Sequence, residues 1–175
     1  DAIVKEVFGG KAQPAYGPVT AANQVWHNAN AKKVPFDAAN ALSALGSEFK
    51  VVERGGKPQL VDVVDRTVKV NLYYPKTPEG DAISAIIVDR FAKVGVPIAA
   101  QGVKPDRLLG QYLVPRNFEL ALFPVDGFGP DPISYMPAML MNGSKHWFGF
   151  TEAGGRPLLD FELEIGRLMR SQQDK

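Results

Sequence analysis

The feature that most constrains the fold is an alternation of strand and helix patterns between residues 67 and 125. The residue patterns predict strands over 67–74, 96–103 and 118–125, with helices over 82–94 and 105–113 between them. This β-α-β-α-β order predicts an α/β fold, in which helices flank a mainly parallel sheet with right-handed crossovers. Ligands of such sheets bind outside the carboxyl ends of the strands, which here lie near Tyr74, near Val103 and over Pro124–Phe128.

The last of these strands leads into a turn that is dense in glycine and proline. The apolar run Phe118–Val125 is followed by Asp126, Gly127, Phe128, Gly129 and Pro130. A helix start is predicted directly afterwards, with Asp131 as the N-cap and Pro132 as the first helical residue. The pattern indicates a buried strand that delivers a loop to a cleft.

The remaining segments predict shorter elements around this unit. The segment 11–35 is rich in Pro, Gly and Asn. Such a stretch is expected either to line a functional surface or to pack as an extended arm. Helices are predicted over 2–8, over 38–45 behind the cap Asp37, and over 157–170, and a hairpin-like pair of strands over 49–54 and 59–64. In helix 105–113 we expect Leu108, Leu109, Tyr112 and Leu113 on one side.

Composition excludes several classes of protein and of site. The 175 residues are 45% hydrophobic and 22% charged. This composition suits a single domain over 1–175 that has its own hydrophobic core. A net charge of +1 without a basic cluster gives no reason to expect a nucleic-acid partner. The absence of cysteine excludes disulfides, thiol catalysis and cysteine zinc sites. No apolar run approaches the roughly 18 residues that a membrane span needs.

No catalytic constellation can be assembled from these residues. The only histidines, His27 and His146, lie in separate predicted loops, so neither a metal site nor an acid–base pair is expected. The serines lack a nucleophile-elbow context, and no glycine-rich fragment has the spacing of a phosphate-binding motif. We therefore expect no enzyme and no cofactor.

Several segments together resemble the family 5 extracellular solute-binding proteins, the peptide- and nickel-type receptors of ABC importers. The chain is similar to the family's patterns "DAIVxxVxxGxAxPAxGP", "FDPxKAxxLLxxAG", "xxIxxxLxKIGI", "FDLALYGW" and "YPDP". The matching segments, in the same order and with the same spacing, are 1–18, 36–46, 81–96, 118–123 and 129–132.

The resemblance implies a lobe with the type II periplasmic-binding-protein fold, and it covers only the C-terminal lobe of the longer two-lobed family members. It therefore implies that the chain is part of a larger protein. The first residues fit this expectation, because they begin a helix pattern without a leader or a disordered lead-in. The implied mechanism is binding: two lobes close on a small solute such as an oligopeptide, and the closed form contacts a permease. The parent would be exported, as a periplasmic protein or a cell-surface lipoprotein with peripheral membrane association.

One departure from the family pattern bears on the ligand. Peptide-binding members typically carry "GWxxDYPDP", in which the Asp pairs with the amino terminus of the peptide. Without gaps, the Trp position is Val125 and the Asp position is Phe128, which suggests an apolar contact instead. Asp126 lies two residues earlier, next to Gly127, and is also an ordinary turn residue.

We accordingly expect ligand contacts from the loop after the third strand, and further contacts from aromatic residues beyond it. The candidate ligand-binding residues are Val125, Asp126, Gly127, Phe128, Tyr135 and Trp147. Loop aromatics can also pack the lobe instead of lining a pocket. The alternative function is a regulatory or scaffolding protein of the envelope that derives from a solute receptor and no longer transports. An open cleft would favour binding, and a cleft filled by its own side chains would favour the scaffold.

Overall fold

The computed structural model describes residues 2–46, 48–126, 129, 131–140, 143–147 and 160–171. The chain forms two compact units, which are described separately below. The first comprises Asp1–Pro14, Lys33–Tyr112 and Asn117–Phe123, and the second Ala15–Lys32, Leu113–Arg116 and Pro124–Lys175. The single domain over 1–175 stays a prediction.

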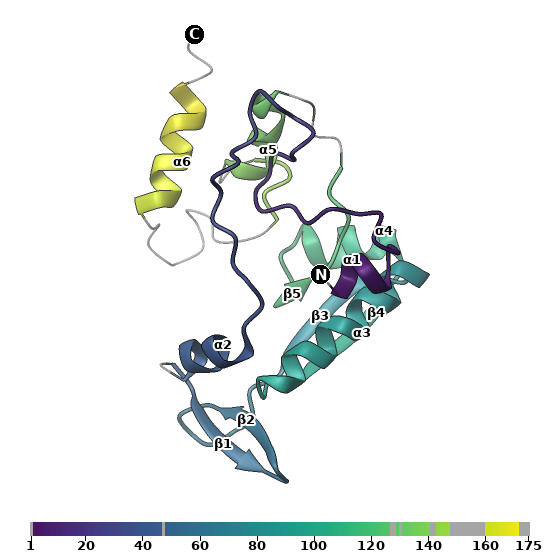
Figure 1. Cartoon of the computed structure of the whole chain (residues 1–175), viewed down its shortest axis with the longest axis vertical. Helices are drawn as coiled ribbons and strands as arrows, with labels where there is room; N and C mark the ends of the chain where they lie inside the picture. Colours follow the sequence, from purple (N-terminus) through teal and green to yellow (C-terminus); the bar gives the residue numbers. More distant parts are fainter. Residues whose placement is uncertain are drawn as a thin grey trace. The chain divides into compact units, whose positions relative to one another are not determined.

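A three-stranded parallel sheet organises the first unit (Figure 1). Its strands are β3 (Val70–Pro75), β4 (Ile98–Val103) and β5 (Leu120–Ala121), in the spatial order β4-β3-β5. Helix α3 (Pro78–Lys93) connects β3 to β4 and packs against both. The predicted α/β fold with helices flanking a parallel sheet is thereby confirmed.

Helix α3 begins earlier than predicted because Thr77 caps it. The Thr77 hydroxyl oxygen accepts a hydrogen bond from the Gly80 backbone N–H at 3.0 Å. The acidic residues Glu79 and Asp81 then lie in the first turn, where the helix dipole favours negative charge.

Strand β5 is much shorter than the predicted strand over 118–125. The Glu119 carboxylate accepts hydrogen bonds from the backbone N–H of Asn71 at 2.6 Å and from its side-chain amide at 2.9 Å. The Asn71 N–H is therefore not available for a backbone ladder at this position. On the other side, the Leu122 N–H still bonds to the Tyr73 carbonyl at 2.9 Å, but Pro124 has no N–H to continue the pattern.

The connection from β4 to β5 differs from the regular helix that the sequence predicts over 105–113. A single turn, α4 (Pro105–Arg107), leads into a π-helix, η1 (Leu108–Leu113). Residues five apart lie on one face of a π-helix, and Leu108 and Leu113 are both only 3% exposed. The expectation that Leu109 shares their face is wrong, because this residue is 43% exposed.

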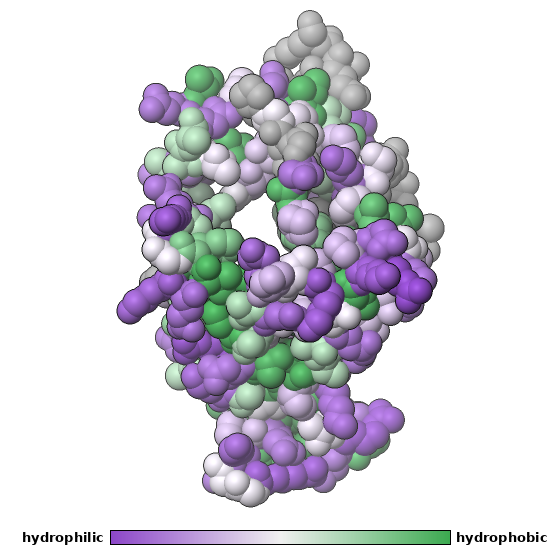
Figure 2. Space-filling view, turned by 90° about the vertical axis from the view of Figure 1, so that its right-hand side faces the viewer, coloured by the Kyte–Doolittle hydropathy of each residue, from purple (hydrophilic) through white to green (hydrophobic). Residues whose placement is uncertain are grey.

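The first unit also contains a β-hairpin, formed by β1 (Lys50–Arg54) and β2 (Lys57–Val61). Gly55 and Gly56 form its turn with φ of +61° and +71°, the left-handed region that a tight hairpin turn requires. Figure 2 shows the hairpin at the lower end of the view, covered on this face largely by hydrophilic residues.

The core of the first unit lies where helix α2 (Ala38–Leu45), β2 and the α3–β4 connection meet. The buried cluster consists of Leu60, Val94 and Val96, which are at most 6% exposed. Partly buried apolar side chains pack around this cluster: Ala38, Leu42, Leu45, Phe49, Val68, Val70, Phe91 and Ile98. A short helix, α1 (Ala2–Glu6), completes the first unit.

The second unit contains a 3₁₀-helix, η2 (Pro132–Tyr135), followed by α5 (Met136–Met139) and α6 (Asp160–Ser171). Asp131 caps η2 and Pro132 is its first residue, which confirms the predicted helix start. The predicted start of the last helix, at 157–159, lies outside the described residues. No helix in the described part of the chain combines the length and the apolar character needed to cross a bilayer.

Candidate ligand-binding site

The sequence predicts a ligand near the carboxyl ends of the sheet strands. In the first unit, an ion pair lies at this edge of the sheet. Lys76 follows β3, and its ammonium group donates to both carboxylate oxygens of Asp81 at 2.9 and 3.0 Å. This bond, with a smaller contribution from the Tyr74 hydroxyl, holds the pKa of Asp81 below its usual value. A Cβ on Gly102 would lie 2.6 Å from Lys76 Cδ, so the side chains of Tyr74 and Lys76 already occupy the space over β4.

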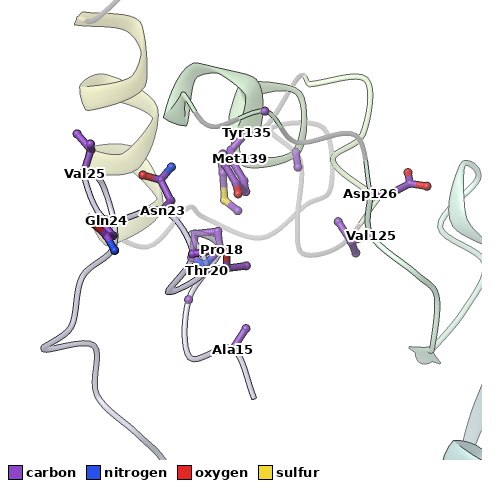
Figure 3. Close-up of a pocket in the computed structure, with 14 residues that line it drawn as sticks. Ala15, Pro18, Thr20, Asn23, Gln24, Val25, Val125, Asp126, Tyr135 and Met139 are labelled. Atoms are coloured by element: carbon purple, nitrogen blue, oxygen red, sulfur yellow. The ribbon is translucent and has the colours of Figure 1, made fainter. Parts of the chain in front are cut away.

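A large open pocket lies instead within the second unit, with a volume of about 970 Å³ (Figure 3). One wall comes from the irregular segment between residues 15 and 25, and the other from the loop after β5 and from η2 and α5. The lining residues are Ala15, Gly17, Pro18, Thr20, Ala22, Asn23, Gln24, Val25, Val125, Asp126, Gly129, Tyr135, Ala138 and Met139. The pocket size suits a small organic solute.

Hydrogen bonds at the start of η2 position the second wall. The Asp131 carboxylate accepts from the Ile133 N–H at 2.9 Å. The Ser134 hydroxyl donates to the Asp131 carbonyl at 2.7 Å and is 3.2 Å from the Gly129 carbonyl. These bonds fix the direction in which η2 leaves the loop, and they thereby direct Tyr135 towards the pocket.

A turn around Asn23 shapes the first wall. The Asn23 side-chain oxygen accepts from the Trp26 N–H at 3.1 Å, and the Asn23 carbonyl accepts from the His27 N–H at 3.0 Å. The ring Nδ1 of His27 lies 3.0 Å from the Val19 carbonyl and closes the same loop. Side chain to backbone bonds of this kind give an irregular segment a defined shape without a helix or strand.

Three of the six predicted site residues line this pocket: Val125, Asp126 and Tyr135. Figure 3 shows that they do not all point the same way: Val125 lies on the side of its loop that faces the other labelled side chains, whereas the Asp126 carboxylate points away from them. Gly127 and Phe128 lie outside the described residues. The ligand contacts of all six remain predictions.

Trp147, the sixth predicted residue, is half-buried and is not among the described residues that line the pocket. Its neighbour His146 is 8% exposed, and its ring Nδ1 lies 2.7 Å from the carbonyl of Ala138 on α5. The guanidinium of Arg116 donates to the His146 carbonyl. The first of these contacts joins the segment around Trp147 to α5, and the second joins it to Arg116. Within the described residues, no three His, Asp or Glu side chains converge as metal ligands would.

The predicted site residues do not include the polar side chains of the first wall, which are Thr20, Asn23 and Gln24. Only the composition of segment 11–35 indicated this wall, because a long irregular segment of this kind is expected to line a functional surface. Nothing in the order of its residues says which positions face a pocket, since the segment has no helical or strand periodicity.

No protein-family model and no curated protein sequence matches the chain. Solved structures of binding proteins do match. The oligopeptide-binding protein AppA from Bacillus subtilis, in complex with a nonapeptide, has 16% identity and a TM-score of 0.64, with coverage of 98% of this chain and 37% of AppA. NikA from Brucella suis, in complex with Fe(III)-EDTA, has 17% identity and a TM-score of 0.68, with coverage of 98% and 32%.

A third match is a periplasmic oligopeptide-binding protein from Thermotoga maritima with bound mannohexaose, at 17% identity and a TM-score of 0.62. It covers 99% of this chain and 34% of that protein, so the chain spans about a third of the length of these structures. The identities are low enough that the likeness concerns the fold alone. The chain therefore has a periplasmic-binding-protein-like fold, the fold of one part of these longer ligand-binding proteins.

Proposed function

We propose that the chain is a ligand-binding lobe of an ABC importer's solute-binding protein, and that the pocket of the second unit holds the solute. The observation that carries this proposal is the open pocket of about 970 Å³ at the loop after β5. Its volume is in the range that encloses small ligands. A cleft filled by the chain's own side chains would favour the scaffolding alternative, whereas an open pocket supports binding.

The solved neighbours support a binding function but leave the ligand open. They hold a nonapeptide, Fe(III)-EDTA and mannohexaose on the same fold, so the fold does not determine the ligand. The proposed role is binding without catalysis, and the solved neighbours support it because they are binding proteins.

The likeness to one part of longer proteins supports three further elements of the proposal. The chain acts as the C-terminal lobe of a two-lobed receptor, and its parent is exported, as a periplasmic protein or a lipoprotein at the cell surface. The parent closes on its solute, an oligopeptide or another small molecule, and delivers it to a permease.

Native mass spectrometry and calorimetry of the full-length protein that carries this chain would test the proposal. The probes are a nonapeptide, mannohexaose and Fe(III)-EDTA, and at least one is expected to give a one-to-one complex. In Val125→Trp, the indole would enter the pocket from a side chain that is 62% exposed, so we expect at least a tenfold loss of affinity, about 1.4 kcal/mol, without loss of folding.

The matched control is Val114→Trp, since Val114 is 58% exposed and lies outside the lining of the pocket. This control is expected to keep the affinity of the unchanged protein. If no probe binds, or if Val125→Trp binds as tightly as the control, the pocket is not the solute site.

A further inference from the structure

The electrostatic character of the pocket bears on the class of solute, given the proposed function above. Of the 14 lining residues that the structure describes, Asp126 is the only one with a charged side chain. Its carboxylate points away from the other labelled lining residues in Figure 3. Apart from Asp126, the described side chains that line the pocket are therefore uncharged.

A charged solute would bind poorly to such a lining. A charged group that moves from water into a pocket without a counter-charge loses its hydration, and neutral hydrogen-bond partners replace this hydration only in part. A free peptide brings an ammonium at one end and a carboxylate at the other. Among the described lining residues there is no lysine or arginine for the carboxylate, and the Asp126 carboxylate, which could receive the ammonium, points away from the other labelled residues.

The uncharged polar groups among the described lining residues are suited to hydroxyl groups. Thr20 and Tyr135 supply hydroxyls, and Gln24 supplies an amide. Each of these side chains can donate and accept hydrogen bonds, as each hydroxyl of a sugar can. A solute with many hydroxyls can therefore exchange its bonds to water for bonds to these groups without leaving a charge unpaired.

The apolar part of the lining matches the other surface of a sugar. Pro18, Val125 and Met139 present aliphatic or thioether surface between the polar groups. The C–H faces of a sugar ring can bury against such surface while the ring hydroxyls bond at the edges. We propose that the solute is an uncharged, hydroxyl-rich molecule of the oligosaccharide class.

The test compares probes of different charge on the full-length protein. Mannohexaose and stachyose are expected to bind more tightly than a nonapeptide with free termini. The Kd of the oligosaccharides is expected to change less than about twofold between roughly 0.05 and 0.5 M NaCl, because salt screens only interactions between charges.

A charge scan at Gln24 provides a second readout, because opposite charges at one position distinguish a charged solute from an uncharged one. Gln24→Glu and Gln24→Lys introduce opposite charges at one exposed lining position, and both are expected to weaken oligosaccharide binding, by roughly three- to tenfold. The matched controls are Gln13→Glu and Gln13→Lys, at an exposed amide outside the lining.

The outcomes separate this inference from the proposed function. Tight oligosaccharide binding with loss in both Gln24 variants supports both. If the nonapeptide binds more tightly, with a salt-dependent Kd and a loss of tenfold or more in Asp126→Asn, the inference is overturned while the binding function stands. Opposite effects of the two Gln24 variants would also overturn it, because they would reveal a charged solute. If no probe binds, the proposed function fails as well.

Discussion

Gly95 shows how one residue can fix a connection in the fold. It joins α3 to β4 with φ at +76°, and its carbonyl accepts a hydrogen bond from the Leu60 N–H at 3.0 Å. A Cβ at this position would lie 2.7 Å from the Pro58 carbonyl oxygen, which belongs to β2 and cannot rotate away. The residue must therefore lack a side chain both for its backbone conformation and for the space beside it.

Gly95→Ala is accordingly expected to destabilise the protein by roughly 1–3 kcal/mol or more, since strain in the backbone adds to the clash with β2. Thermal denaturation measures the effect. Gly110→Ala is the control, because the Cβ there would meet nothing within 4 Å and the backbone is not left-handed. Equal melting temperatures for the two variants would contradict the description of this connection.

Asp62 makes a second residue-scale prediction, which concerns pH. Its carboxylate accepts hydrogen bonds from the backbone N–H groups of Val64 and Arg66 at 3.0 and 2.9 Å, and from the Arg66 side chain at 2.8 Å. The Arg66 backbone bond is the main cause that lowers the pKa of Asp62 from its ordinary value of 3.8. Stability from this carboxylate is complete above pH 3.8 and is lost as the pH falls through the folded-state pKa.

In Asp62→Asn the shape is kept but the charge is removed. We expect a lower melting temperature than that of the unchanged protein at pH 7, and a difference that shrinks as the pH falls below 3.8 and the folded protein takes up a proton at Asp62. A smaller penalty should remain in an Arg66→Met background, because the backbone bonds are kept while the bond from the Arg66 side chain is lost. A penalty that is independent of pH would show that the carboxylate charge does not stabilise this turn.

The residues of the candidate site could be predicted only where a regular pattern pointed to them. Val125 and Asp126 follow an apolar strand pattern, and Tyr135 follows a recognisable helix start, so their place near one loop could be inferred. The opposite wall comes from a segment about a hundred residues away along the chain, and its contacts depend on tertiary structure that no local pattern encodes.

At the scale of elements, the sequence predicted which segments are helices and strands better than it predicted their ends and their geometry. The predicted strand over 118–125 is reduced to two residues because the Glu119 side chain replaces a backbone partner. The helix over 105–113 winds as a π-helix, so Leu109 faces solvent. Both differences arise from side-chain contacts between elements, which propensity and periodicity do not contain.

The N-cap of η2 gives an element-scale prediction that links stability to binding. Asp131→Ala removes the acceptor for the Ile133 N–H and should cost about 1 kcal/mol of stability. Because η2 carries Tyr135 towards the pocket, solute affinity should fall as well. Asp131→Asn is the control, since its side-chain oxygen can still cap the helix. If Asp131→Ala lowers the melting temperature but leaves the affinity unchanged, Tyr135 does not contact the solute.

At the scale of the whole molecule, the α/β class could be predicted because it rests on the order of the elements, while the division into two units could not. Each unit gathers segments that are separated in the sequence, and the chain passes between the units several times. Such a division depends on which segments pack together, and local pattern says little about contacts over this distance along the chain.

The pocket nevertheless gives a prediction for the molecule as a whole, because the lining residues that the structure describes all belong to the second unit. A solute that occupies it joins residues 15–25 to residues 125–139, and amide hydrogen exchange in both segments should slow together when mannohexaose is added. The hairpin of β1 and β2 belongs to the first unit and is the internal control, where exchange should not change. Protection of only one of the two segments would mean that they do not form the walls of a single site. Protection of the hairpin as well would mean that binding raises the free energy of global unfolding, and slower exchange in the two segments would then not locate the solute.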